Sequence, residues 1–573
     1  MEKVTDAPAL RRPADEEVCG RRVPDPFRWL EDDGAAECGQ WLREQQRLLD
    51  RTVPAWRTRP AFRALLDELT GTGGAAVPVV SAPVLRGRRR FFLRRRAGQE
   101  LPVLVTAREG EDVEAGQVVL DPMRLDPSGR TTLSAWRPSW SGRLLAFQVA
   151  VGGAEEPVLR VMDVTEGRMV DGPLAPGRPS AVAWLTDDTG FYYVTGKAGE
   201  ARRVRLHRIG DDPAHDPVVF ETAMRHLSVR LGPEGRWLTI SAAPGAQTGN
   251  VLHLADLATG PAGRRGLAAP QPVVVHDGTV DGSSALIRTG PRGLLYGITN
   301  AGAPRGRVCL IDPADPRSTA WTTLVEPGPD NLLSACTALT DPGTSAVRLL
   351  VSTVTNGVPR LSLHDPTGRL LADIPAPGRG PGTVSAPSTP PGDTDRVWFT
   401  YTDFTTPPAV HRLTLPHGQR RPETGLAPAP SASSARPRAS GHQDPDVRQV
   451  TYRSEDGTPV GLYLIGAPDD PDQLATLLSY SPYHNVRPGT PYPTVLLTSP
   501  RTDPRVGAAH MRKFAAALQQ ATTSGKPVLL RTEDGVGHGP RAASRYACLH
   551  SDALAFCAHH TGLLPPGDGQ ATW

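Results

Sequence analysis

Glu234-Gly235-Arg236-Trp237-Leu238-Thr239-Ile240 is a stretch in which a glycine turn leads directly into a run of mostly large apolar residues. The same shape returns at Ser141–Phe147, Asp188–Val194, Arg292–Ile298 and Asp395–Tyr401. Turns followed by short apolar runs are typical of β-strands joined by tight connections. Neighbouring copies often lie about 45–50 residues apart, which is the length of a four-stranded propeller blade. The repeat therefore predicts a β-propeller.

The part of the chain that carries this repeat runs from residue 72 to residue 425 and has almost no helical periodicity. Its roughly 350 residues, divided by the blade length, correspond to about seven blades. A pair of β-sandwiches would also contain many short strands and is the alternative interpretation. We expect the seven-bladed propeller.

The two flanks of this region are different in character. Ala36–Leu49 and Pro60–Leu69 space their apolar residues three and four positions apart, as amphipathic helices do. Towards the C-terminus, short apolar runs alternate with helical patterns, and this order is typical of an α/β fold with a parallel sheet. In chain order these segments are Tyr492–Thr498, Ala508–Gln520, Pro527–Arg531 and Arg541–Thr561.

Between the propeller region and these segments lies Gln419–Asp446, which is rich in proline and serine and lacks apolar periodicity. This composition predicts a flexible linker or a long surface loop. Val447–Arg453 and Val460–Ile465 follow it and read as two strands joined by a turn at Asp456-Gly457.

Composition narrows the function classes. The chain has 573 residues, with 63 Lys and Arg against 60 Asp and Glu and a net charge of +3. That near balance argues against a nucleic-acid partner or a membrane surface. The one basic cluster, Arg86–Arg96, reads as a strand with solvated ends. Six scattered cysteines without a Cys-x-x-Cys pair, and no visible secretory signal or membrane-spanning run, lead us to expect a cytoplasmic protein.

Two loops of the α/β part carry candidate chemistry. Asp503 follows the apolar run Tyr492–Thr498, and His538, flanked by Gly537 and Gly539, follows Pro527–Arg531. In α/β sheets the functional loops lie at the carboxyl ends of the strands. An acid after one strand and a histidine after the next is the order in which an α/β hydrolase places its acid and base.

Several motifs resemble the prolyl oligopeptidase family in matching order along the whole chain. Val23–Asp32 resembles the family's Asp-Pro-Tyr-Arg-Trp-Leu-Glu-Asp opening, and Phe399–Pro408 resembles its last propeller strand. Tyr480–Val486 is similar to the family's Tyr-Ser-Pro-Leu-His-Asn-Val, and Gly537-His538-Gly539 matches the segment around its catalytic histidine.

The resemblance implies a serine peptidase with a seven-bladed propeller and an α/β-hydrolase domain built from both chain ends. It divides the chain into 1–71 and 426–573, the two parts of the hydrolase domain, and 72–425, the propeller. By the same resemblance Asp503 would be the triad acid, His538 the triad base, and Arg505 a substrate-binding residue. Pro504 stands where the family usually has a second aspartate, which puts the orientation of Arg505 in doubt.

The nucleophile that the resemblance implies is missing. The family's serine sits in Gly-x-Ser-x-Gly, a sharp turn that exposes the hydroxyl. No serine in this chain has glycine at both the second position before it and the second position after it. Only Gly466–Leu478 occupies the place of the elbow, so on the order of 120 residues of strand–helix units are absent. The resemblance therefore predicts a truncated hydrolase domain with an internal deletion.

Four functional interpretations follow. The leading hypothesis is a homologue that is inactive as a peptidase. The first alternative is an active prolyl endopeptidase that uses an unrecognised serine, for which Ser479, Ser481 and Ser499 are the nearest candidates. The second is a peptide-binding or regulatory module, in which a protein partner could complete the hydrolase sheet. The third is a non-functional product of a deletion.

The expected ligands are short proline-containing peptides, as the resemblance implies. No metal or organic cofactor is indicated, because no cluster of His, Cys and Asp has ligand spacing and no glycine-rich phosphate loop follows a strand.

Overall fold

The computed structural model describes residues 9–12, 14–18, 21–32, 34–70, 79–112, 114–153, 156–174, 180–197, 200–245, 249–258, 270–355, 357–378, 381–392, 394–403, 408–415, 419–422, 478, 481–501, 503, 507–537 and 541–563. Within these ranges, no helix combines the length and the apolar character needed to cross a bilayer.

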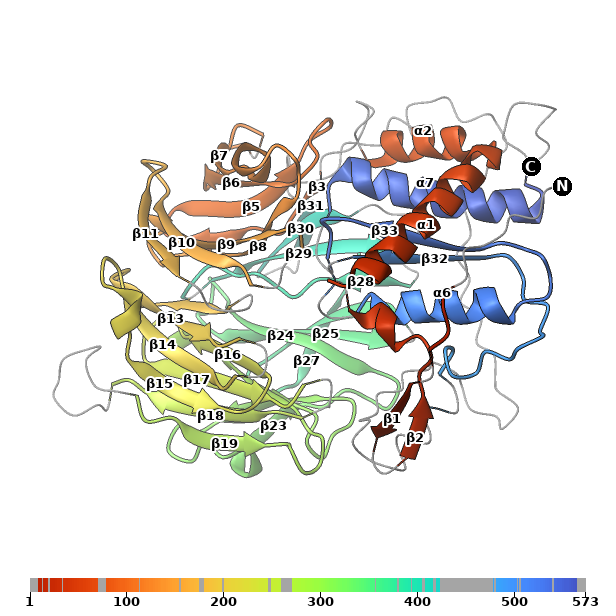
Figure 1. The fold of residues 1–573 in the computed structure, drawn as a ribbon. Helices are drawn as coiled ribbons and strands as arrows, with labels where there is room; N and C mark the ends of the chain where they lie inside the picture. Colours follow the sequence, from red (N-terminus) through yellow and green to blue (C-terminus); the bar gives the residue numbers. More distant parts are fainter. Residues whose placement is uncertain are drawn as a thin grey trace.

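Seven antiparallel sheets follow one another along the chain and form a β-propeller (Figure 1). Blade 1 consists of β3 (Val79–Val80), β4 (Val84–Arg86), β5 (Arg89–Arg95), β6 (Val103–Arg108) and β7 (Gln117–Leu120), and blade 2 of β8 (Thr131–Pro138), β9 (Leu144–Val151), β10 (Val158–Asp163) and β11 (Met169–Leu174). Blade 3 consists of β12 (Val182–Trp184), β13 (Gly190–Thr195), β14 (Arg202–Arg208) and β15 (Val218–Thr222). Blade 4 consists of β16 (His226–Leu231), β17 (Trp237–Ala243), β18 (Val251–Asp256) and β19 (Val273–Asp277).

Blade 5 consists of β20 (Ala285–Thr289), β21 (Leu295–Thr299), β22 (Arg307–Ile311) and β23 (Thr322–Val325). Blade 6 consists of β24 (Leu332–Thr340), β25 (Val347–Thr355), β26 (Val358–His364) and β27 (Leu370–Ile374). Blade 7 consists of β28 (Gly382–Val384), β29 (Arg396–Asp403), β30 (Ala409–Thr414) and β31 (Gln419–Pro422). The predicted seven-bladed propeller is therefore confirmed, and the pair of sandwiches is wrong.

Apolar clusters between neighbouring blades hold the propeller together. In β17, Leu238 and Ile240 pack towards blade 3, whereas Trp237, on the opposite face of the same strand, packs towards blade 5. Side chains alternate between the two faces of a strand, so a strand covered on both faces needs apolar residues at successive positions. This is why Trp237, Leu238 and Ile240 are all apolar although they point to different faces of the strand.

Among the strands that the structure describes, none is shared between the first and last blades where the ring closes. Blade 7 contributes Trp398 and Val410 to the same buried cluster as Phe92 and Val105 of blade 1. The Ser388 hydroxyl also donates a hydrogen bond to the Pro83 carbonyl oxygen, at 2.6 Å. The closure thus depends on side-chain packing across one blade interface.

The helices from both chain ends pack around one pair of parallel strands (Figure 1). Leu42 of the N-terminal part lies in one buried cluster with Ala516 and Leu530 of the C-terminal part, and Trp56 lies in a second with Leu529 and Ala555. The helices are α1 (Ala36–Thr52), α2 (Arg59–Thr70), α6 (Ala509–Ala521) and α7 (Ala543–Thr561), and the parallel strands are β32 (Val495–Pro500) and β33 (Val528–Glu533). A hairpin of β1 (Asp15–Val18) and β2 (Arg21–Pro24) precedes α1. A short helix, α3 (Pro122–Leu125), connects blade 1 to blade 2.

Two sequence interpretations need correction. Gln419–Pro422 pairs with β30 as the last strand of blade 7, so the predicted linker cannot begin at Gln419. In the basic cluster, Arg90 and Arg94 are buried rather than solvated, and Arg94 donates to the Glu114 carbonyl oxygen at 3.1 Å. The predicted hairpin of Val447–Arg453 and Val460–Ile465 lies outside the described residues.

Candidate active site at the edge of the parallel strands

The two strands that precede the candidate residues are neighbours in register. β32 pairs with β33 in parallel from Val495↔Val528 to Pro500↔Glu533. The Arg501 amide continues the ladder and donates to the Glu533 carbonyl oxygen at 2.9 Å. Because parallel strands end at the same edge of a sheet, the two candidate loops start side by side, as the sequence predicted.

Of the three predicted site residues, the structure describes one. Asp503 lies half-buried, three residues beyond the end of β32. His538 and Arg505 lie outside the described residues, so their roles, and the pairing of Asp503 with His538, stay predictions.

The loop that leads to His538 rests on the propeller. A Cβ atom placed on Gly153, in the turn between β9 and β10, would lie 2.0 Å from the Gly537 nitrogen. Gly153 also has φ of +77°, which favours glycine. The backbones at Gly153 and Gly537 therefore approach more closely than any side chain would allow. This contact fixes the start of the histidine loop against blade 2.

The propeller also caps the helix that follows this loop. Glu100 of blade 1 accepts the Ala543 amide on its carbonyl oxygen at 3.0 Å and the Ser544 amide on its carboxylate at 2.9 Å. The first amides of a helix lack partners within the helix, and a carboxylate there is favoured by the helix dipole. Glu100 thus holds α7 from 444 residues away in sequence, a role that sequence patterns did not reveal.

A network of buried charges lies beneath the two loops. Asp552 of α7 is 4% exposed and accepts hydrogen bonds from Arg59 Nε at 2.5 Å and Arg531 Nε at 2.7 Å. Burial alone would lower the pKa of Arg531, but its hydrogen bond to Asp552 and the charge of that carboxylate raise it. Glu533, at the end of β33, accepts from Arg541 at 2.9 Å. The network ties α2, β33 and α7 together.

Two of the motifs that carry the family resemblance contact each other. The Tyr483 hydroxyl donates to the Asp25 carboxylate at 2.8 Å, and Lys513 Nζ lies 2.5 Å from the same carboxylate. Burial and the bond to Asp25 raise the pKa of Tyr483. The N-terminal segment is thereby joined to the segment that precedes β32.

Another serine–histidine contact lies nearby. Ser481 Oγ is 2.8 Å from His484 Nδ1, and burial, followed by the charge of Lys513, lowers the pKa of His484. The i, i+3 spacing of the two residues is the sequence signal for this pair. Among the residues that the structure describes, no three His, Cys, Asp or Glu side chains gather in a way that could hold a metal ion.

Comparisons with known proteins agree with this architecture. The chain matches the family model for the prolyl oligopeptidase N-terminal beta-propeller domain over residues 8–424 and that for the prolyl oligopeptidase family over residues 446–563. It is 21% identical to a prolyl endopeptidase of Elizabethkingia miricola, with 95% of this chain and 94% of that protein covered. It is 24% identical to prolyl oligopeptidase A of Amanita bisporigera, with 78% and 59% covered.

Solved structures share the fold. Prolyl oligopeptidase B from Galerina marginata, bound to a 35mer hydrolysis and macrocyclization substrate, superimposes with a TM-score of 0.81 at 16% identity, covering 98% of this chain and 99% of that one. A structure from a study of two prolyl endopeptidases gives 0.82 at 21% identity, covering 97% and 100%.

The alignment with the Elizabethkingia miricola enzyme runs over 692 positions, whereas this chain has 573 residues. Over a hundred positions of that relative therefore have no counterpart here. The propeller match covers most of the chain, and the second match covers the α/β part. The chain is a member of the prolyl oligopeptidase family of serine peptidases.

Proposed function

We propose that this chain is a prolyl oligopeptidase homologue that binds proline-containing peptides but does not hydrolyse them. The observation that carries the proposal is the absence of any serine in a Gly-x-Ser-x-Gly setting. Hydrolysis by this family's chemistry needs a serine that forms an acyl-enzyme and an amide beside it that stabilises the oxyanion. Losing the serine of such a triad lowers kcat on the order of a million-fold.

The α/β part supports the same interpretation. In the ranges given above, its parallel sheet consists of β32 and β33 alone. The relative from Elizabethkingia miricola carries over a hundred further positions, and only Gly466–Leu478 stands in this chain where the elbow would be. A sheet that has lost its central strands exposes edges that readily pair with other chains. A protein partner that completes the sheet is therefore part of the proposal.

Peptide binding is supported by the propeller and by the relatives. All seven blades are present, and the propeller keeps its backbone contact with the histidine loop at Gly153. Prolyl oligopeptidase B from Galerina marginata, which has this fold, is bound to a 35mer peptide substrate. We infer that this chain also takes peptides.

A second candidate function is peptide hydrolysis through another serine. The contact between Ser481 Oγ and His484 Nδ1 at 2.8 Å is the observation in its favour, since a serine nucleophile needs an adjacent base. Against it, both residues belong to one tight turn, in which the Asn485 amide donates to the Ser481 carbonyl oxygen. A turn of this kind is not the strand-to-helix elbow that supplies an oxyanion donor.

Labelling with a fluorophosphonate probe separates the two candidates. We expect the purified full chain to show no mass increase after exposure to the probe, because no activated serine is present. Labelling of wild type that disappears in Ser481→Ala would establish the second candidate. Labelling that persists in Ser481→Ala would contradict both and would require the modified serine to be found by peptide mapping.

A further inference from the structure

Four arginines occupy matching positions in the strands that line the axis of the propeller. Arg137, Arg230 and Arg288 are each the penultimate residue of the first strand of their blade, and Arg86 is the last residue of β4. Each follows an apolar residue in its strand, at a position where successive side chains point to opposite faces. The four side chains therefore stand at one level of the channel and come from blades 1, 2, 4 and 5.

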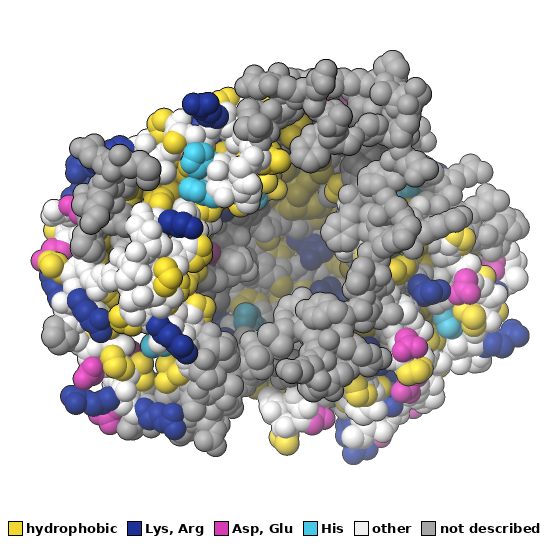
Figure 2. Space-filling model, turned by 90° about the vertical axis from the view of Figure 1, so that its right-hand side faces the viewer, with side chains coloured by type: hydrophobic (Ala, Val, Ile, Leu, Met, Phe, Trp, Pro, Cys, Tyr) yellow, Lys and Arg dark blue, Asp and Glu magenta, His cyan; other side chains and the backbone are white. Residues whose placement is uncertain are grey.

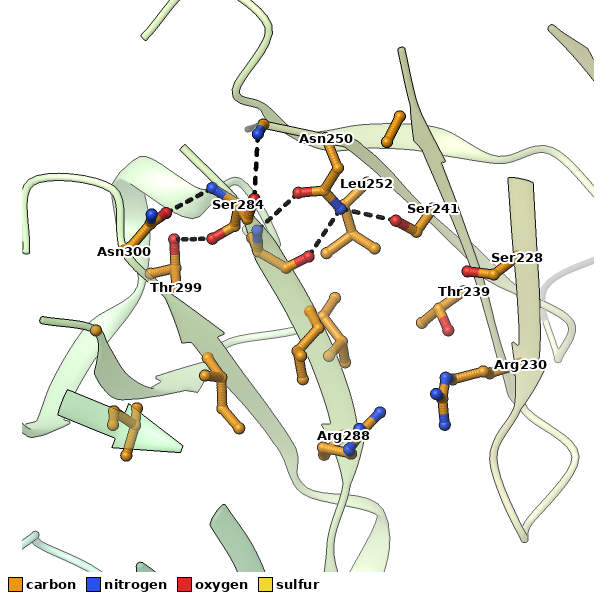
Figure 3. Close-up of a pocket in the computed structure, with 18 of the residues that line it drawn as sticks. Ser228, Arg230, Thr239, Ser241, Asn250, Leu252, Ser284, Arg288, Thr299 and Asn300 are labelled. Carbon is orange, nitrogen blue, oxygen red and sulfur yellow. Dashed lines mark hydrogen bonds between the residues drawn. The ribbon is translucent and has the colours of Figure 1, made fainter. Parts of the chain in front are cut away.

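All four arginines line a single cavity of about 180 Å³. Arg230 and Arg288 also line a second cavity of about 610 Å³, which extends along blades 4 to 6. Figure 3 shows their guanidinium groups projecting from neighbouring strands into the same space. Figure 2 shows the molecule deeply hollowed, with cationic side chains visible inside the hollow.

These guanidinium groups have no carboxylate partner among the residues that the structure describes. Neither cavity has an Asp or Glu in its described lining, and no carboxylate of the described residues acts on the charge of any of the four arginines. Arg86 stacks on the Trp140 ring, 4.4 Å from its centroid. Burial and the charge of a neighbouring arginine lower the pKa of Arg86 and of Arg288 to about 10. The cavity thus concentrates positive charge that the described part of the protein leaves uncompensated.

The wall of the larger cavity is polar and held in place. Asn250 Nδ2 donates to Ser241 Oγ at 2.7 Å and to the Ala285 carbonyl oxygen at 2.9 Å, and Asn250 Oδ1 accepts the Ala285 amide at 2.8 Å (Figure 3). Serine and threonine hydroxyls on such a wall can pair with a peptide backbone. Cavities of several hundred Å³ with a few fixed polar groups are typical of ligand sites.

We propose that the propeller channel binds acidic peptides, whose carboxylates pair with Arg137, Arg230 and Arg288. Arginine presents a planar fork that matches the two oxygens of a carboxylate. A channel lined by one sign of charge also concentrates ligands of the opposite sign. The inference rests on the proposed peptide-binding function and names the class of peptide.

The position of the arginines sets the length of peptide needed. β8 begins beside Arg130, whose side chain lies against Gly535 of the hydrolase part, and Arg137 follows seven residues later along the strand. At about 3.3 Å per residue, this separation is about 23 Å. A peptide that reaches from the arginines to the hydrolase edge therefore needs about seven extended residues, and a small anion cannot span it.

The test compares two fluorescein-labelled nonapeptides, each with one Gly-Pro pair. One peptide carries three Glu residues, and the other has Gln at the same three positions. Fluorescence anisotropy with the purified full chain measures both affinities, and mass spectrometry of the same samples detects cleavage. The variants are Arg137→Met with Arg230→Met, and separately Arg288→Met. The control is Arg360→Met, an exposed arginine of β26 that lines neither cavity. Thermal melts check that each variant is folded.

We expect the Glu peptide to bind at least about tenfold more tightly than the Gln peptide, because a hydrogen bond to a charged group contributes on this scale. That preference should fall with added salt, disappear in the double variant, weaken in Arg288→Met and remain in Arg360→Met. Equal binding of the two peptides would overturn the inference and leave the proposed function standing. Cleavage of either peptide would contradict the proposed function alone. If neither peptide binds, both the proposed function and this inference are overturned. Full displacement by inorganic phosphate at the concentration of the peptide would overturn the assignment to peptides.

Discussion

Replacing Asp552 by alanine should loosen the helix that closes the α/β part of the chain. Its carboxylate is buried and accepts from Arg59 at 2.5 Å and from Arg531 at 2.7 Å, so it links α7 to α2 and to β33. In the variant, the buried Arg531 keeps only weak partners among the described residues: the Glu533 carboxylate at 3.7 Å and the Cys548 sulfur at 3.6 Å.

The expected loss of stability follows from the arginine charge that stays buried when the Asp552 carboxylate is removed. Removing one partner of a buried ion pair costs about 3–5 kcal/mol, because the remaining charge stays buried without compensation. The Arg59 side chain is 35% exposed and can turn to water, so we expect the lower end, about 3 kcal/mol. A free energy of this size corresponds to a more than hundredfold change in an opening equilibrium.

Hydrogen exchange of the α7 amides measures that opening directly. The matched control is Asp67→Ala, which removes the partner of Arg63 in a half-exposed pair one turn apart on α2, at 2.9 Å. That change should cost no more than about 1 kcal/mol. If the two variants raise exchange in α7 equally, or Asp552→Ala leaves it unchanged, the network does not hold the helix and our reasoning is wrong.

Three further predictions concern the propeller. His207→Leu should lower the melting temperature and cost about 3 kcal/mol, because its ring nitrogens lie 3.0 Å from the buried carboxylates of Asp171 and Asp216, which would each lose one of their hydrogen-bond partners. Gly153→Val should expose the loop at Gly537 to proteolysis, since its Cβ would clash with that backbone; Gly110→Val, with φ of +90° and open space around it, should not. Burial raises the pKa of Cys336 from 9.0 to about 12, so the stability that its protonated thiol contributes should be lost as pH rises above about 9. Cys336→Ala should flatten that loss in thermal melts, and an unchanged slope would contradict it.

The spacing of apolar residues predicted much of the fold, because strands and helices each impose their own period on the residues that face the core. Tyr492–Thr498 and Pro527–Arg531 overlap β32 and β33, and both predicted helices of the N-terminal flank are present as α1 and α2. The parallel pairing of the two strands brings the start of both candidate loops to one edge. Asp503 lies at that edge, and nothing in the described residues tests the role of His538 or Arg505.

Features that depend on distant contacts were not predictable. Glu100 caps α7 only because the propeller and the hydrolase part meet there, and no local signal marks it. Arg90 and Arg94 look like solvated residues in a basic run, yet alternation along β5 turns both inward. The arginines that line the propeller channel, Arg86, Arg137, Arg230 and Arg288, lie far apart in the sequence. They become one cluster only when the blades are arranged around a common axis.

The most direct test of the central claim is turnover of a short fluorogenic Gly-Pro peptide by the purified full chain, with and without a serine-directed inhibitor. Our account predicts no release of the fluorophore above the uncatalysed rate, because no serine stands in a nucleophile elbow. Turnover after proline that the inhibitor abolishes would show that another serine supplies the nucleophile, and would contradict the account.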